Sequence, residues 1–239
     1  MKIRVLADAD SVAGAAAEFI AAEARAALRA QGRFVMAVSG GHTPRQMLRS
    51  LALQEVPWNG LHVFQVDERI APWGHPDRNL IHLRESLLGH SPLREDQILA
   101  MPVESPDLDV AVADYARRLS EIAGSPSVLD LVQLGIGLDG HTASLLPGDP
   151  VLDVMDSTVA LTGVYQGRRR MTLTYPILNR SRCILWIVTG GGKAGMLGRL
   201  RAGDESIPAG RVNRKKALIF ADCAAAGQSH PSEVEEELP

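Results

Sequence analysis

The chain has 239 residues, which is long enough for one large α/β domain or two small ones. Apolar residues make up 46% and charged residues 22%, as in an ordinary globular protein, whereas aromatic residues make up only 4%. So few aromatic side chains argue against a stacking platform for single-stranded nucleic acid, and a net charge of −3 argues against binding nucleic acid or an anionic membrane. We therefore expect no nucleic-acid partner and no membrane partner.

The cysteines and the N-terminus predict a reducing compartment. Cys183 and Cys223 each lie in an apolar, strand-like run without a neighbour at metal-ligand spacing, so we expect buried, reduced thiols. The N-terminal MKIRVLADAD reads as a short strand followed by acids rather than as a signal peptide, and no apolar run reaches the roughly 18 residues of a membrane span. We expect a cytoplasmic protein.

Strand-like and helix-like segments alternate along most of the chain. In chain order we predict a strand at 3–6, a helix from 10 or 11 to about 30, a strand at 34–38, a helix at 44–53, a strand at 61–66, a helix at 79–88, a weak strand at 98–101, a helix at 107–123, strands at 129–134, 158–162, 171–174 and 183–188, a helix at 193–201 and a strand at 217–221. This alternation predicts a mostly parallel sheet with helices on both faces. The acidic tail at 228–239 is predicted to be disordered.

The segment 39–44, SGGHTP, has the pattern of a phosphate-binding turn. It follows a predicted buried strand, and Gly40 and Gly41 allow the backbone to approach a ligand closely. Thr43 is a good N-cap and Pro44 suits the first helical position, so we expect a helix start whose free N–H groups favour an anion. The alternative is a tight turn without a ligand.

Two further strand ends carry positive charge. The GGGK turn ends in Lys193, and a lysine at a helix start is unfavourable for the helix dipole unless an anion lies beside it. Asp67, Glu68 and Arg69 end another strand, and we expect these charges to face water, a partner or a substrate. Arg69 could hold a phosphate through paired hydrogen bonds, with Asp67 or Glu68 orienting it. A solvated lysine and a plain surface ion pair are the alternatives.

The segment 129–147, LDLVQLGIGLDGHTASLLP, contains a candidate catalytic pair. Its apolar strand turns on glycines and then presents Asp139 and His141 at the carboxyl end of a sheet, where open α/β folds bind ligands. Imidazole titrates near neutral pH, so His141 could act as a general base, with Asp139 orienting either the imidazole or the attacking water. A histidine satisfied by the local turn is the alternative.

Other chemistry fits this segment less well. The GxGxxG spacing at 135–140 would suit a dinucleotide, but Pro147 interrupts the next helix, and Thr162 and Gly163 stand where an acidic residue is needed. The sequence has no G-x-S-x-G elbow, no cysteine near the histidine and no metal-ligand spacing. General-base hydrolysis or proton transfer on a phosphorylated substrate remains. An arginine of the RRR run at 168–170 could stabilise an oxyanion, although an exposed basic loop is the more common case.

The segments SGGHTPRQML, VDERIAP, LDLVQLGIGLDGHTASLLPG, RMTLTYPILN and VTGGGKAGML, in this order, resemble the 6-phosphogluconolactonase family. The resemblance covers nearly the whole chain, and LGIGLDGHTASLLP is its most specific part. It implies a single Rossmann-like α/β domain over 1–227. It also implies hydrolysis of 6-phospho-D-glucono-1,5-lactone, a small-molecule partner, to 6-phospho-D-gluconate without a metal or a cofactor. We expect a monomer or a weak homo-oligomer.

The same resemblance assigns roles to residues. It implies that His141 is the base that activates water against the lactone carbonyl, and that Asp139 and Arg170 lie at the rim of the active site. The positions that match the family's phosphate-binding residues are Gly40, Gly41, Thr43, Arg69 and Lys193. The chain departs from the family at Arg78, where serine is usual, and at Phe220, where tryptophan is common.

Two rival functions fit parts of the sequence. Glucosamine-6-phosphate deaminases carry a glutamate shortly after the GH pair, in a stretch resembling GHIAFNEP, whereas GHTASLLP has no acid before Asp149. Sugar-phosphate sensor domains keep the phosphate turns but usually lose the base and are fused to a DNA-binding helix-turn-helix. This chain retains His141, and we expect no additional domain.

Overall fold

Two β-sheets form the framework of the protein, of which the computed structural model describes residues 1–235. The strands of the larger sheet are β1 (Lys2–Leu6), β2 (Phe34–Val38), β3 (Leu61–Gln65), β5 (Ile98–Leu99), β6 (Leu131–Leu134), β9 (Cys183–Val188), β10 (Ala217–Asp222) and β11 (Ser232–Glu235). Their order is β11-β1-β10-β9-β6-β2-β3-β5. All neighbours pair in parallel except β11, which runs antiparallel to β1. The predicted α/β class with a mostly parallel sheet is confirmed.

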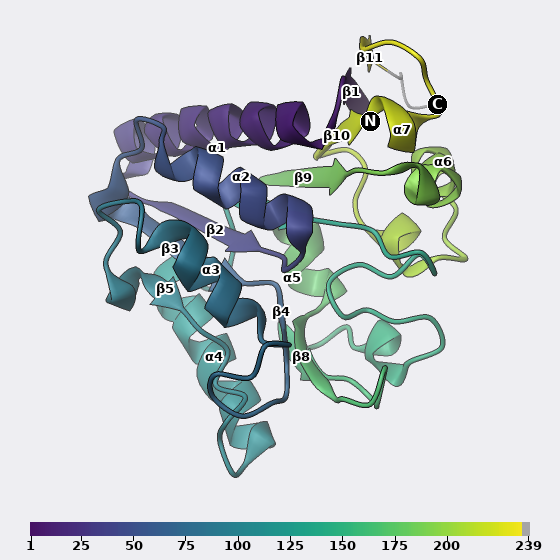
Figure 1. Ribbon diagram of the computed structural model, residues 1–239. Coiled ribbons are helices and arrows are strands. Elements are labelled where there is room, and N and C mark those ends of the chain that lie inside the picture. Colours follow the sequence, from purple (N-terminus) through teal and green to yellow (C-terminus); the bar gives the residue numbers. More distant parts are fainter. Residues whose placement is uncertain (236–239) are drawn as a thin grey trace.

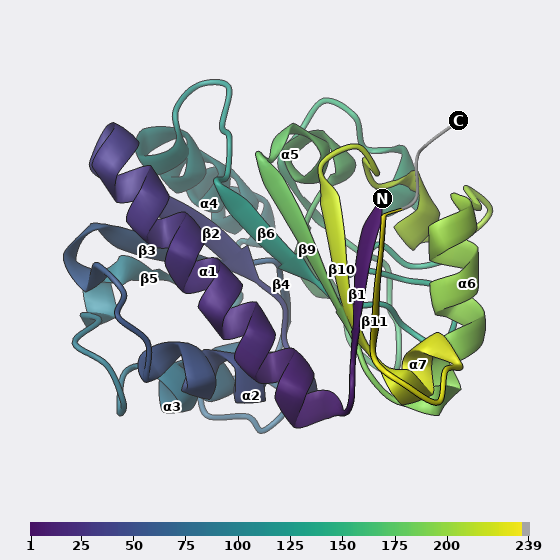
Figure 2. The ribbon, with the colours of Figure 1, turned by 90° about the horizontal axis from the view of Figure 1, so that it is seen from above.

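Helices cover both faces of the larger sheet, as Figures 1 and 2 show, with α1, α2 and α3 on one face and α4 and α5 on the other. The helices are α1 (Ala9–Gln31), α2 (His42–Ala52), α3 (Asn79–Leu87), α4 (Leu108–Ala123), α5 (Tyr175–Arg180), α6 (Ala194–Ala202) and α7 (Cys223–Ala226). Within residues 1–235, none is both long enough and apolar enough to cross a membrane.

The central strands read as unbroken apolar runs because both of their faces are covered. Phe34, Met36 and Val38 of β2 belong to the core that contains the buried residues of α1 and α2. Val35 and Ala37, which point the other way, belong to the core that contains those of α4 and α5. Two hydrophobic cores therefore pack against the opposite faces of one sheet.

The strand order reverses beside β2. From β2 the chain proceeds to β3 and β5 on one side, whereas β6, β9 and β10 follow one another on the other side. Ligands of open α/β sheets bind at the carboxyl ends of strands where the order reverses. The carboxyl ends of β2, β6 and β9 are therefore where the fold itself predicts a site.

A smaller antiparallel sheet lies at this edge, beside the carboxyl-terminal end of β3 (Figure 1). Its strands are β4 (Asp67–Arg69), β8 (Arg170–Leu173) and β7 (Val159–Leu161), in the order β4-β8-β7. Neither of the two short strands predicted around the RRR turn joins the larger sheet: β8 pairs with the charged residues of β4, and β7 pairs with β8.

The prediction that all three charges of β4 face water, a partner or a substrate is wrong for Glu68, which is 0% exposed. Its carboxylate accepts hydrogen bonds from the backbone N–H groups of Asn79 (2.8 Å) and Leu80 (2.9 Å) and lies 3.1 Å from Nε of Arg78. Arg78, also buried, reaches Glu104 at 2.6 Å. Arg78 therefore ties β4 to the start of α3, and a serine in its place could not make this ion pair.

Three smaller expectations also need correction or comment. Residues 232–235 form β11, because the backbone of the free edge of β1 can pair with any extended segment. Residues 236–239 of the predicted tail lie outside the described residues.

Cys183 and Cys223 are free but only half-buried, and Cys223 begins α7 instead of lying in a strand. Phe220 packs edge-on against Phe19, with ring centroids 5.9 Å apart.

Candidate active site

A cavity of about 630 Å³ opens at the carboxyl-terminal edge of the sheet, a size that suits a small-molecule ligand. Its walls come from the loops after β2, β6 and β9, from β4 with the start of α3, and from the β7–β8 hairpin. Every residue predicted for the site lines this cavity: Gly40, Gly41, Thr43, Arg69, Asp139, His141, Arg170 and Lys193. The structure thus brings together residues that come from distant parts of the sequence.

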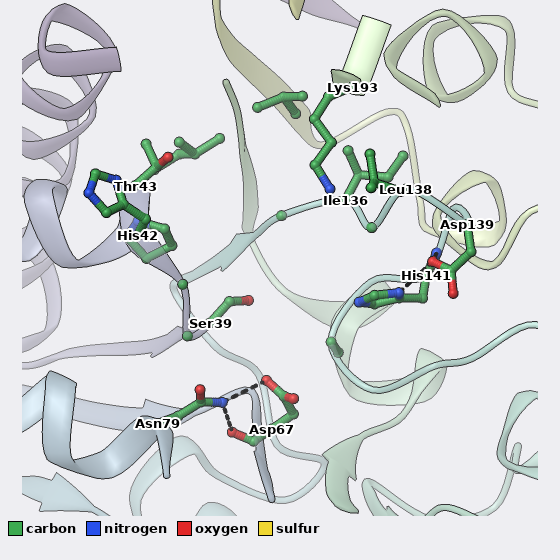
Figure 3. Close-up of a pocket in the computed structure, with 18 of the residues that line it drawn as sticks. Ser39, His42, Thr43, Asp67, Asn79, Ile136, Leu138, Asp139, His141 and Lys193 are labelled. Carbon is green, nitrogen blue, oxygen red and sulfur yellow. Dashed lines mark hydrogen bonds and ion pairs between the residues drawn. The ribbon is translucent and has the colours of Figure 1, made fainter. Parts of the chain in front are cut away.

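Asp139 and His141 form a hydrogen-bonded pair in the loop after β6. Nδ1 of His141 lies 2.5 Å from Oδ1 of Asp139, and the backbone N–H of His141 donates to the same oxygen at 3.2 Å. An ionised carboxylate only accepts hydrogen bonds, so Nδ1 carries the proton and Nε2 keeps its lone pair. Figure 3 shows the Nε2 side of the ring facing the cavity. An imidazole held in this way can act as a general base through its free acceptor nitrogen.

Asp139 is kept in its charged form by its neighbours. Burial raises the pKa of this carboxyl, but hydrogen bonds from His141 and Tyr165, together with the positive charge that His141 carries when its ring is protonated, outweigh burial and hold the pKa below its ordinary value. The pKa of Asp139 is thus lower in the folded protein than in the unfolded chain. The ionised Asp139 carboxylate therefore stabilises the fold fully above the ordinary carboxyl pKa, and this stabilisation is lost as the pH falls through the lower pKa of the folded protein.

Tyr165 is a cavity residue that the sequence analysis missed. Its hydroxyl donates to Oδ2 of Asp139 at 2.9 Å, and its ring packs edge-on against His141. The hydrogen bond to Asp139 is the main cause that raises the pKa of Tyr165. A Tyr-Gln-Gly-Arg stretch between two predicted strands is a signal for a two-residue hairpin turn, and the tip of such a hairpin projects from its sheet.

The turns after β2 and β9 are joined by side chains. Oγ1 of Thr43 lies 2.6 Å from Oγ1 of Thr189, another residue that the sequence analysis missed. The prediction that Thr43 caps the next helix is wrong, because α2 begins two residues earlier than predicted, at His42, with Gly41 as its N-cap and no side chain capping it. Gly41 has φ = 126°, a conformation that favours glycine. The first N–H groups of α2 are therefore available at the cavity wall.

Three cations surround the cavity. Arg170 is buried in β8 rather than exposed in a basic loop, and burial lowers its pKa. Burial also lowers the pKa of Lys193, whose amine extends into the cavity in Figure 3. Arg69, Arg170 and Lys193 all line the cavity. Three positively charged side chains at one cavity favour an anionic ligand.

The other two arginines of the RRR run form their hydrogen bonds outside the cavity. Nε of Arg168 donates to Asp77 at 2.8 Å, and Nε of Arg169 donates to the backbone oxygen of Thr162 at 3.2 Å. Neither lines the cavity. Within residues 1–235, no group of three or more His, Cys, Asp or Glu side chains is arranged to hold a metal ion.

The chain is similar to known proteins over most of its length. Residues 7–220 match the model of the family described as glucosamine-6-phosphate isomerases/6-phosphogluconolactonase. The chain belongs to this family. Among relatives, 6-phosphogluconolactonase from Nostoc sp. is 32% identical over 232 residues, covering 94% of this chain and 96% of the relative. The human 6-phosphogluconolactonase is 32% identical over 238 residues, covering 94% and 92%.

Solved members of the isomerase/lactonase family share the fold. The crystal structure of 6-phosphogluconolactonase from Thermotoga maritima superposes with a TM-score of 0.81 at 26% identity, covering 92% of this chain and 98% of that one. A monomeric glucosamine-6-phosphate deaminase superposes equally well, with a TM-score of 0.82 at 17% identity. Fold alone therefore does not separate the two activities of the family, and the choice rests on the site.

The Asp139–His141 pair needs the space beside Gly137, because a side chain at this position would collide with the imidazole. A Cβ added there would lie 2.2 Å from Nδ1 of His141, whereas one added at Gly135 would meet nothing closer than 3.9 Å. We predict that Gly137→Ala forces the imidazole away from Asp139 and lowers the free energy of unfolding by about 1–3 kcal/mol, as overpacking does. Gly135→Ala is the matched control and should leave the pair intact. Crystal structures and denaturation of both variants measure this, and an unmoved imidazole in Gly137→Ala would contradict it.

Proposed function

We propose that the protein hydrolyses 6-phospho-D-glucono-1,5-lactone to 6-phospho-D-gluconate, the second step of the oxidative pentose phosphate pathway. The observation that carries this proposal is the imidazole of His141, which is held by Asp139 and has its free nitrogen toward a cavity lined by Arg69, Arg170 and Lys193. The relatives' names support the same activity. An anionic sugar ester fits such a cavity in both charge and size.

His141 would act as the general base. Nε2 takes a proton from water, and the resulting hydroxide attacks the lactone carbonyl to give a tetrahedral oxyanion. The imidazolium, stabilised by the Asp139 carboxylate, then gives its proton to the ring oxygen as the ester C–O bond breaks. The product is the open-chain acid with a free hydroxyl. The buried guanidinium of Arg170 is our candidate to stabilise the oxyanion, since a donor in a desolvated site is most effective there.

The phosphate would occupy the opposite part of the cavity. Gly40, Gly41 and Thr43 supply the start of α2, where unbonded N–H groups and the helix dipole favour an anion. Arg69 and Lys193 add positive charge from β4 and from the turn before α6. These residues do not take part in the bond cleavage, so their role is to bind and orient the substrate.

The isomerase activity of the family fits less well. The GHTASLLP segment has no acid between His141 and Asp149. Asp149 is not available as a substitute, because its two carboxylate oxygens accept hydrogen bonds from the N–H groups of Val151 (2.9 Å) and Gly163 (2.8 Å). We therefore expect no release of ammonia from glucosamine 6-phosphate. A cytoplasmic location and a monomeric or weakly oligomeric state stay predictions.

We predict that His141→Ala lowers kcat by about 10² to 10⁴, the usual contribution of a general base, and leaves KM nearly unchanged. The lactone is generated with glucose-6-phosphate dehydrogenase, and acid release is followed after subtraction of spontaneous hydrolysis. A chelator should not change the wild-type rate. If His141→Ala turned over at the wild-type rate, the assignment of the base would be wrong.

We also predict that Arg69→Ala and Lys193→Ala each raise KM more than they lower kcat, because the phosphate is remote from the bond that breaks. Lys215→Ala is the matched control, since Lys215 is exposed just before β10, at the amino-terminal edge of the sheet. Steady-state kinetics of the three variants separate the two parameters. Unchanged KM in both cavity variants would mean that the phosphate binds elsewhere.

A further inference from the structure

Tyr165 reaches the catalytic pair from a different sheet. It lies in the hairpin between β7 and β8, where the N–H of Tyr165 donates to the oxygen of Arg168 at 2.9 Å and the N–H of Arg168 returns a bond of 3.2 Å. Gln166 and Gly167 both have positive φ, 52° and 79°, as a two-residue hairpin turn requires. The turn therefore fixes where the tyrosine side chain leaves the backbone.

The hairpin is anchored by the arginine that closes its turn. Nε of Arg168 donates to Asp77 at 2.8 Å, and its NH2 group lies 2.9 Å from Nε2 of His75. Asp77 and His75 belong to the loop between β4 and α3, which also accepts a 2.6 Å bond from Arg69 through the backbone oxygen of Asp77. This anchor holds the hairpin, and with it Tyr165, at a set distance from the loop after β6.

The Tyr165 hydroxyl completes the hydrogen bonding of Asp139. Oδ1 of Asp139 is occupied by His141, and Oδ2 accepts from Tyr165 at 2.9 Å. The two hydrogen bonds go to different oxygens of the carboxylate and so fix its rotation. The Asp139 side chain is 35% exposed, so water would compete for a carboxylate that had lost one of these bonds.

The ring of Tyr165 adds packing on two sides. It meets the imidazole of His141 edge-on, with centroids 5.9 Å apart at 67°. The guanidinium carbon of Arg170 lies 5.0 Å from the centre of the same ring. Tyr165 thus contacts both the imidazole and the Arg170 guanidinium, and these contacts favour one orientation of each.

From these contacts we propose that Tyr165 is a positioning residue for the lactonase reaction: through Asp139, its hydroxyl keeps His141 in the Nδ1-protonated tautomer with Nε2 directed at the substrate. This inference rests on the proposed role of His141 as the base. Partners that orient metal-bound histidines contribute about 10- to 100-fold, and we expect a contribution of similar size from a partner that orients a catalytic histidine.

The test is Tyr165→Phe, which removes the hydroxyl and keeps the ring. We expect kcat to fall by about 10- to 100-fold with KM changed less than about two-fold, because substrate contacts are retained. In 15N-histidine NMR, with the His141 signal identified by its loss in His141→Ala, wild type should show the Nδ1-protonated tautomer. Tyr165→Phe should show a mixture of both tautomers.

Tyr115→Phe is the matched control. Tyr115 is fully buried outside the cavity, and its hydroxyl accepts from the N–H of Gln65 at 2.8 Å. Its loss should lower the thermal midpoint and leave both kcat and the His141 tautomer unchanged. A structural role for Tyr165 would give this same pattern.

Two results would overturn the inference while His141→Ala stays inactive: wild-type kcat in Tyr165→Phe, or a lowered kcat with an unchanged tautomer. If His141→Ala itself kept full activity, the proposed role of His141 as the base would fail. The tautomer comparison would then still decide whether Tyr165 holds the pair.

Discussion

Parallel pairing of β2, β6 and β9 is the constraint on which the rest of the structure depends. In the sheet, Met36 and Ala37 of β2 stand opposite β6, and all four residues of β6 stand opposite β9. Because parallel neighbours end at the same edge, the turns at 39–44, 135–141 and 190–193 meet there although they are far apart in sequence. Hydrogen bonds also link these segments. The backbone N–H of Ser39 donates to Oε1 of Gln133, and the hydroxyl groups of Thr43 and Thr189 share a hydrogen bond.

The smaller sheet contributes charged and polar side chains, for which the larger sheet has little room. A parallel sheet with two covered faces has little room for charged side chains except at its strand ends. The antiparallel strands β4, β7 and β8 place Arg69, Arg170 and Tyr165 opposite those ends. Buried Glu68 and its partner Arg78 hold this sheet to the start of α3. The larger sheet therefore provides the backbone turns and Lys193, and the smaller sheet provides two arginines and the hydrogen-bond donor that orients Asp139.

The parts that could be predicted from the sequence are those encoded locally. The central strands are apolar runs ended by glycines, and the Asp139–His141 pair lies within three residues, so both were visible in the pattern. The parts that could not be predicted depend on pairing between distant segments. Tyr165 meets Asp139 across 26 residues, Thr43 meets Thr189 across 146, and Glu68 is buried only because β4 packs against α3. Strand β11 was missed because pairing with an open edge depends little on side chains.

Our central proposal is that the cavity binds the phosphate at the glycine turns and presents the lactone carbonyl carbon to His141. A crystal structure with the product, 6-phospho-D-gluconate, tests this most directly. We predict that the phosphate lies against the start of α2, within hydrogen-bonding distance of Arg69 or Lys193, and that the carboxylate lies beside Nε2 of His141. A phosphate bound beside His141, or a product bound outside this cavity, would contradict the account.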